Sequence, residues 1–152
     1  MMEYKSKYIQ DGMVSVHPII HEILKEMDSW CQKYDKSNLM ISESLTTLAQ
    51  DNALKRVSSS HREGRACDID VSPHGVLWPK QKLIAFSHFF GEKYKSLGAN
   101  SKLGTRTFLL VHDSGHGLHC HAQIGKDIVE KFKNTYPNWK YPVEKNKRKK
   151  DE

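Results

Sequence analysis

The sequence predicts a single α+β domain in which helices pack on one face of a small antiparallel sheet. Three observations lead to this fold class. Long segments carry apolar residues at helical spacing, and shorter segments alternate apolar with polar residues as half-buried strands do. The chain has 152 residues, of which 38% are hydrophobic and 28% charged. That length and composition suit one globular domain with its own core.

The first half of the chain predicts a long helix, a short strand and a second helix. Apolar side chains recur at helical spacing over residues 16–34, and Pro18 suits the first turn of that helix. Residues 39–41 are all apolar, which is typical of a short buried strand. Residues 47–56 predict a helix that leads into a polar loop over residues 57–64.

The second half predicts two more helices and a strand. A helix is expected over residues 79–97, where apolar residues form one stripe, and a shorter helix over residues 126–134. Residues 107–112 are apolar on both faces of a strand, so we expect this strand in the centre of the sheet. Residues 113–115 predict a turn.

Two further strands alternate strictly between apolar and polar residues. Residues 65–71 and 118–124 each place apolar side chains on one face and polar or small ones on the other. Gly64 precedes the first of them and can adopt the positive φ that suits a junction of loop and strand. If the two strands are neighbours, their polar rows converge on the face of the sheet opposite the helices. These rows contain Ala66, Asp68 and Asp70 from the first strand and His119, His121 and Gln123 from the second.

The charge pattern separates a folded part from a tail. The net charge is +6, and residues 145–150 hold five basic residues in six. We therefore expect a domain over residues 1–143 and a basic, disordered tail over residues 144–152. An alternative role for the tail is to tether the protein to an anionic polymer such as cell wall, lipopolysaccharide or nucleic acid.

The cysteine count and the hydropathy indicate the compartment. Three cysteines are an odd and sparse number, which argues against a disulfide framework. No run of about 18 apolar residues is present, so no membrane span is expected. The N-terminal residues show no apolar signal-peptide segment. The sequence thus predicts a protein made in the cytoplasm, and we expect a monomer because nothing requires a partner chain.

Histidine and aspartate residues gather in two segments, residues 59–68 and 116–121. His61, Asp68 and His121 offer two imidazoles and one carboxylate. Hydrolytic zinc sites use such ligands and keep a fourth position open for water. The sequence therefore predicts a Zn²⁺ site on the polar face of the sheet.

A general base is expected among the residues beside these ligands. His119 stands two residues before the last ligand on the same strand face, His116 lies at the start of that segment, and Asp113 can reach in from the preceding turn. Ser59 and Arg65 flank His61 in the first segment and are the candidate substrate-binding residues.

The first segment resembles a known family pattern. Ser59-x-His61-x-x-Gly64-x-Ala66-x-Asp68 matches the pattern of the VanY-type D-alanyl-D-alanine metallopeptidases at every fixed position. That superfamily also contains the penicillin-insensitive murein endopeptidases and the hedgehog signalling domain. The resemblance covers residues 16–124 and implies that zinc is held by the motif's histidine and aspartate and by the later His121.

The second segment, His116-x-x-His119-x-His121, looks most like the murein endopeptidase branch, which implies that the two earlier histidines assist catalysis. Many members of the family place an acidic residue three before the last ligand, where this chain has Leu118. Members that bind a free C-terminal carboxylate carry an arginine after the first strand, where residues 44–47 read Ser-Leu-Thr-Thr. An endopeptidase is therefore favoured over a carboxypeptidase.

These observations together predict a zinc-dependent peptidase that hydrolyses an amide bond in peptidoglycan peptides. A basic domain of this kind resembles a bacteriophage lysis enzyme, which acts at the bacterial cell wall after release or travels in the virion. Anionic cell-envelope polymers are possible further partners. Two alternatives stay open: a non-catalytic zinc-binding module of the hedgehog type, and a metal-dependent nuclease.

Overall fold

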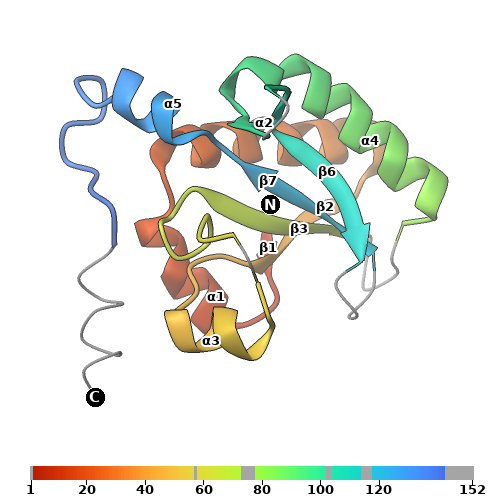
Figure 1. Cartoon of the computed structure of the whole chain (residues 1–152). Helices are drawn as coiled ribbons and strands as arrows, with labels where there is room; N and C mark the ends of the chain where they lie inside the picture. Colours follow the sequence, from red (N-terminus) through yellow and green to blue (C-terminus); the bar gives the residue numbers. More distant parts are fainter. Residues whose placement is uncertain (1, 57, 73–77, 102–103, 114–117, 143–152) are drawn as a thin grey trace.

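The computed structural model describes residues 2–56, 58–72, 78–101, 104–113 and 118–142 (Figure 1). The predicted tail, residues 144–152, and residues 114–115 of the predicted turn lie outside these ranges. The elements in chain order are β1 Glu3–Tyr4, α1 Lys7–Gly12, η1 Met13–Ser15, α2 Pro18–Asp35, β2 Asn38–Glu43, α3 Leu48–Ala53, β3 Ala66–Ser72, α4 Lys80–Lys93, η2 Lys95–Leu97, β4 Ala99–Asn100, β5 Arg106–Thr107, β6 Leu109–Asp113, β7 Leu118–Gln123 and α5 Lys126–Lys131, where η denotes a 3₁₀ helix. The α+β class is as expected.

Five strands form one sheet in the order β1-β2-β3-β7-β6 (Figure 1). β1 runs parallel to β2, and the other three neighbouring pairs are antiparallel. The sheet is therefore mixed, and the expectation of a purely antiparallel sheet is wrong. β1 went unrecognised because it has only two residues, too few to show an alternating pattern.

β6 lies at an edge of the sheet, so the expectation of a central strand over residues 107–112 is also wrong. Phe108 and Leu109 are buried where α4 packs against this part of the chain. Leu110 and Val111 are only partly buried. An apolar stretch can therefore form an edge strand where a helix covers part of it, so apolar residues alone do not predict a central position in the sheet.

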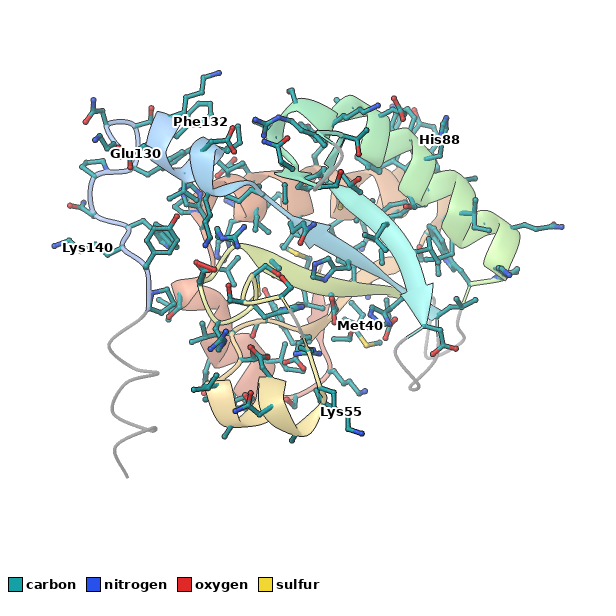
Figure 2. All side chains as sticks on the ribbon, viewed as in Figure 1. Met40, Lys55, His88, Glu130, Phe132 and Lys140 are labelled. Atoms are coloured by element: carbon teal, nitrogen blue, oxygen red, sulfur yellow. The ribbon has the colours of Figure 1, made fainter. Side chains whose placement is uncertain are left out.

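The two long helices α2 and α4 pack against each other and cover one face of the sheet (Figure 1). The ring centroid of Trp30 in α2 lies 5.8 Å from that of Phe86 and 6.0 Å from that of Phe90, both in α4. His88 is exposed on α4 (Figure 2). The alternation predicted for β3 and β7 is confirmed on the side of the core, where the sheet buries Cys67, Ile69, Cys120 and Ala122.

Gly64 has the positive φ expected at the entry to β3, with a value of 71°. A Cβ atom at this position would lie 2.3 Å from the Ser15 carbonyl oxygen and 3.2 Å from the Trp139 ring. The Gly64 carbonyl also accepts a hydrogen bond of 2.8 Å from the His17 amide. The glycine therefore lets three distant parts of the chain meet beside the loop that carries His61.

Replacing Gly64 by alanine is expected to lower the free energy of unfolding by about 2–4 kcal/mol, because left-handed strain and a backbone clash combine. Urea unfolding followed by circular dichroism measures this difference. Gly104→Ala is the matched control: its φ is 80°, but no described atom lies within 4 Å of the added carbon. In the control, only the conformational strain should lower the free energy of unfolding. Equal decreases in both variants would show that the contact with Ser15 is unimportant.

Candidate metal centre

The carboxylate of Asp68 lies between the two histidines predicted to be its partners. Its Oδ1 atom is 3.2 Å from His61 Nε2 and 2.8 Å from His121 Nδ1. One potential ligand atom from each of the three residues lies within 4.8 Å of the other two. A metal ion with bonds of about 2.0–2.2 Å can bridge such a group after small side-chain adjustments. The structure thus brings together the three residues that the sequence singled out.

The sheet register explains why two of them meet. Asp68 on β3 is directly opposite His121 on β7, and cross-strand partners in an antiparallel pair project from the same face. Their neighbours Cys67 and Cys120 point into the core. The histidine–aspartate group therefore lies on the sheet face opposite the core.

The loop before β3 supplies the third residue, His61. Backbone hydrogen bonds from the Arg65 amide to the Ser60 carbonyl and from the Gly64 amide to the His61 carbonyl, 2.9 and 3.2 Å long, close this loop into turns. His61 Nδ1 lies 2.9 Å from the carbonyl oxygen of Ser44 at the end of β2. A carbonyl only accepts, so Nδ1 carries the proton and Nε2 is directed at Asp68.

Burial and charge set the protonation of the metal-free group. Burial alone would lower the pKa of His61, but the hydrogen bond and the charge of Asp68 outweigh it, and the pKa is raised above its ordinary value. Burial would raise the pKa of Asp68, but hydrogen bonds from His121 and His61 hold it well below its usual range. A proton on His61 therefore occupies the position facing Asp68 Oδ1 that a metal cation would take.

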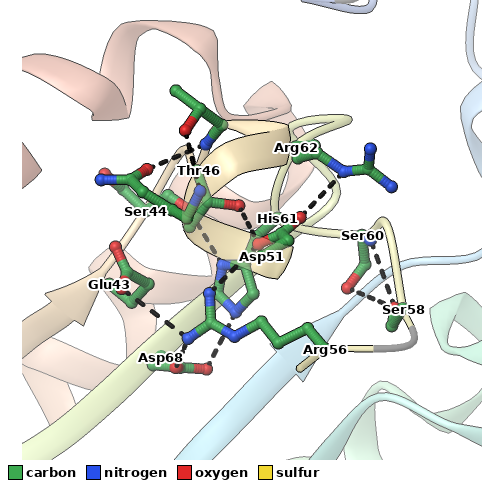
Figure 3. Close-up of polar contacts among 12 residues, drawn as sticks. Glu43, Ser44, Thr46, Asp51, Arg56, Ser58, Ser60, His61, Arg62 and Asp68 are labelled. Carbon is green, nitrogen blue, oxygen red and sulfur yellow. Dashed lines mark hydrogen bonds and ion pairs between the residues drawn. The ribbon is translucent and has the colours of Figure 1, made fainter. Parts of the chain in front are cut away.

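A cluster of charged residues that no local sequence pattern predicts borders the group (Figure 3). Arg56 Nη2 lies 4.0 Å from Asp68 Oδ2 and 3.7 Å from Glu43 Oε2, and its Nη1 lies 3.4 Å from Asp51 Oδ1. The buried Asp51 also accepts a hydrogen bond of 2.7 Å from Thr46 Oγ1. Its Oδ2 atom forms an ion pair with a second arginine, Arg62, whose Nε lies 2.8 Å away. Glu43 is opposite Asp68 in the register of β2 and β3. Because these residues come from several separate segments, only the three-dimensional pairing brings them together.

The predicted catalytic residues fall in different places. His119 is buried on β7, with Nε2 3.5 Å from Asp68 Oδ2, so it belongs to the same cluster. Asp113 is exposed at the end of β6, where it pairs in register with Leu118. His116 lies outside the described residues.

Of the two predicted substrate-binding residues, Ser59 bonds within the loop that carries His61, and Arg65 joins this loop to the residue that follows β7. The Ser59 hydroxyl donates to Glu63 Oε1 at 2.5 Å. Arg65 is buried and donates from Nη1 to the Ile124 carbonyl at 2.6 Å and from Nη2 to Glu63 Oε1 at 3.1 Å. Arg65 also lines a cavity at the end of β7.

Comparison of the chain with protein-family models, with curated proteins and with solved structures found no significant match. Among the helices that the structure describes, none is long and apolar enough to cross a membrane. The fold and the site define an α+β domain with a buried His61–Asp68–His121 group that could hold a metal ion.

Proposed function

We propose that this chain is a zinc-dependent peptidase that hydrolyses an amide bond in peptidoglycan peptides. The convergence of His61, Asp68 and His121, which are distant in the sequence, is the observation that supports this proposal most strongly. The resemblance of residues 59–68 to the VanY-type and murein endopeptidase motif is its second support. By the same reasoning, we propose that the protein acts at the bacterial cell wall, as a phage lysis enzyme does.

The donor set favours zinc over a softer or harder metal. Two imidazole nitrogens and one carboxylate oxygen are the ligands of hydrolytic zinc sites. All three cysteines of the chain are buried and free, and burial in the core raises the pKa of Cys120 to about 12. Thiolates therefore do not compete for the ion. A bound zinc ion would supply Lewis acidity and an activated water molecule.

The chain's own groups around this ion would orient the ligands and move protons. The Ser44 carbonyl fixes the ring of His61, and Gln123 Oε1 lies 3.1 Å from His121 Nε2 and fixes the second ring. His119, with its ring beside Asp68, is the first candidate to hold a proton or to stabilise negative charge on the peptide carbonyl. His116 and Asp113 remain the other candidates for the base.

Residues 44–47 support an endopeptidase. The Ser44 hydroxyl donates to the Ile9 carbonyl at 2.8 Å, and the Thr46 hydroxyl donates to Asp51. This stretch therefore serves the fold where related enzymes that bind a free carboxylate use an arginine. The nearby Arg56 is offset by the carboxylates of Glu43 and Asp51.

The test is to incubate the purified protein with isolated sacculi, with and without a chelator, and to analyse the released peptides by mass spectrometry. New amine termini should appear, and both chelation and His61→Ala should abolish them. His88→Ala, which changes an exposed histidine on α4, is the control and should retain activity. Zinc binding without cleavage of sacculi would favour the non-catalytic zinc-binding module instead. Leu118 supports this alternative, because it stands where many members of the family have an acidic residue. Cleavage of nucleic acid lost in His61→Ala would indicate the nuclease.

A further inference from the structure

A second feature of the polar face is a cavity of about 500 Å³ at the end of β7, next to the start of α5. Its lining includes side chains of Ser58, Arg65, Asn100, Gln123 and Lys126. These residues come from the loop before His61, the junction with β3, the short strand β4, the end of β7 and the start of α5. The cavity lining contains none of the three candidate metal ligands.

Gln123 joins this cavity to the metal centre. Its Oε1 lies 3.1 Å from Nε2 of His121, whose Nδ1 faces Asp68. Because Gln123 also lines the cavity, only one side chain separates a group bound there from a candidate metal ligand. A peptide whose reacting bond lies at the metal centre can therefore place a neighbouring residue in the cavity.

The charges around the cavity favour an anion. Arg65 Nη2 and Lys126 Nζ lie 3.1 and 3.8 Å from the same carboxylate, that of Glu63. The Ser59 hydroxyl also donates a hydrogen bond to this carboxylate, at 2.5 Å from Oε1. Two cations thus share one anion.

The other charged pair at this cavity is balanced. The carboxylate of Asp127 is paired with the guanidinium of Arg106. One positive charge consequently stays uncompensated among the described residues that surround the cavity. Within the same part of the structure, the buried Nε of Arg65 has no hydrogen-bond partner, and the Lys126 side chain is 68% exposed and accessible to a ligand.

We propose that this cavity is an anion subsite that binds the carboxylate of a peptide residue next to the reacting bond. Lys126 supplies the charge, and Ser58, Asn100 and Gln123 supply polar groups for hydrogen bonds. The inference rests on the proposed peptidase function, and it adds a preference for acidic substrates. The carboxylate belongs either to an acidic side chain or to a free C-terminus of the peptide.

The experiment uses synthetic peptides that span the bond released from sacculi, with glutamate or glutamine beside that bond and with a free or amidated C-terminus. The zinc-loaded wild type, Lys126→Glu and Lys131→Glu are compared by kcat/KM and by calorimetric titration. Lys131 is an exposed lysine on the same helix, so its variant carries the same change in net charge. Lys126→Glu should lower kcat/KM and affinity for the glutamate or free-acid peptide roughly 3- to 10-fold relative to the values for its neutral counterpart. Lys131→Glu should leave this ratio unchanged.

The outcomes separate the two proposals. Selectivity for the glutamate peptide identifies a side chain as the source of the carboxylate, and selectivity for the free C-terminus identifies the chain end. If the wild type cleaves all peptides equally, or if both lysine variants behave alike, the proposed subsite is wrong and the proposed peptidase function is unaffected. If the zinc-loaded wild type neither binds nor cleaves any peptide, this result contradicts both the proposed peptidase function and the proposed subsite.

Discussion

Tight Zn²⁺ binding is expected to disappear when Asp68 is replaced by asparagine. The variant is nearly isosteric, but it removes the one negative charge among the three candidate ligands. Loss of a residue that only supports a ligand typically weakens metal binding by about 10- to 100-fold, and loss of the ligand itself should exceed that range. Competition with a chelating dye measures the dissociation constant, and circular dichroism checks that the variant is folded.

Asp70→Asn is the matched control for this experiment, because Asp70 is two residues further along β3 and on the same face of the strand. It removes the same charge without removing a candidate ligand, so the affinity should change less than about 10-fold. If Asp68→Asn still binds one zinc ion with nearly wild-type affinity, the ligand assignment is incorrect.

The stability of the metal-free protein is expected to fall as the pH rises above about 6.5, while the stabilisation by zinc grows over the same range. The pKa of His61 is raised in the folded state, so its contribution is fully present below the unfolded value and is lost as the pH rises through the folded value. The pKa of Asp68 is lowered, so its contribution is present above about pH 4 and is lost in more acidic solution. The metal-free protein should therefore be most stable between these limits.

Zinc has the opposite pH dependence, because it needs both imidazoles without their ligand-side protons. Zinc at a thousandfold excess over its dissociation constant should raise the free energy of unfolding by about 4 kcal/mol, which corresponds to an increase of roughly 8–16 °C in Tm. Thermal unfolding from pH 5 to pH 9, with excess zinc and with chelator, measures the two curves. They should diverge with increasing pH, and His61→Gln should remove most of the divergence. Parallel curves would contradict the protonation assigned to His61.

The candidate ligands could be found from the sequence because local rules determine their faces. Strand alternation placed Asp68 and His121 on polar rows, and the register of β3 and β7 brings these rows together. Gly64 was expected to adopt a positive φ where the loop that carries His61 meets the strand, and it does so. Helical periodicity likewise predicted α2 and α4, although the latter ends at Lys93 and continues as a short 3₁₀ helix.

The remaining features depend on pairings between distant segments. Arg56 and Asp51 border the metal centre only because α3 and the loop after it fold back towards β2 and β3 (Figure 3). His17 is buried and caps α2, and the ring centroid of Trp139 lies 4.6 Å from that of its imidazole. Burial lowers the pKa of His17 to about 4, with a smaller effect from His21. No local pattern reveals a contact across more than a hundred residues.

The contact of Trp139 with the N-terminal part of the chain also bears on the order in which the site is assembled during synthesis. The indole donates a hydrogen bond of 3.1 Å to the Ser15 carbonyl, beside Gly64 and the loop that carries His61. His61 leaves the ribosome long before Trp139 and before the partner strand that carries His121. The site can therefore acquire its final shape only after Trp139 has emerged, so a nascent chain that ends before this residue is expected to hold no competent metal centre.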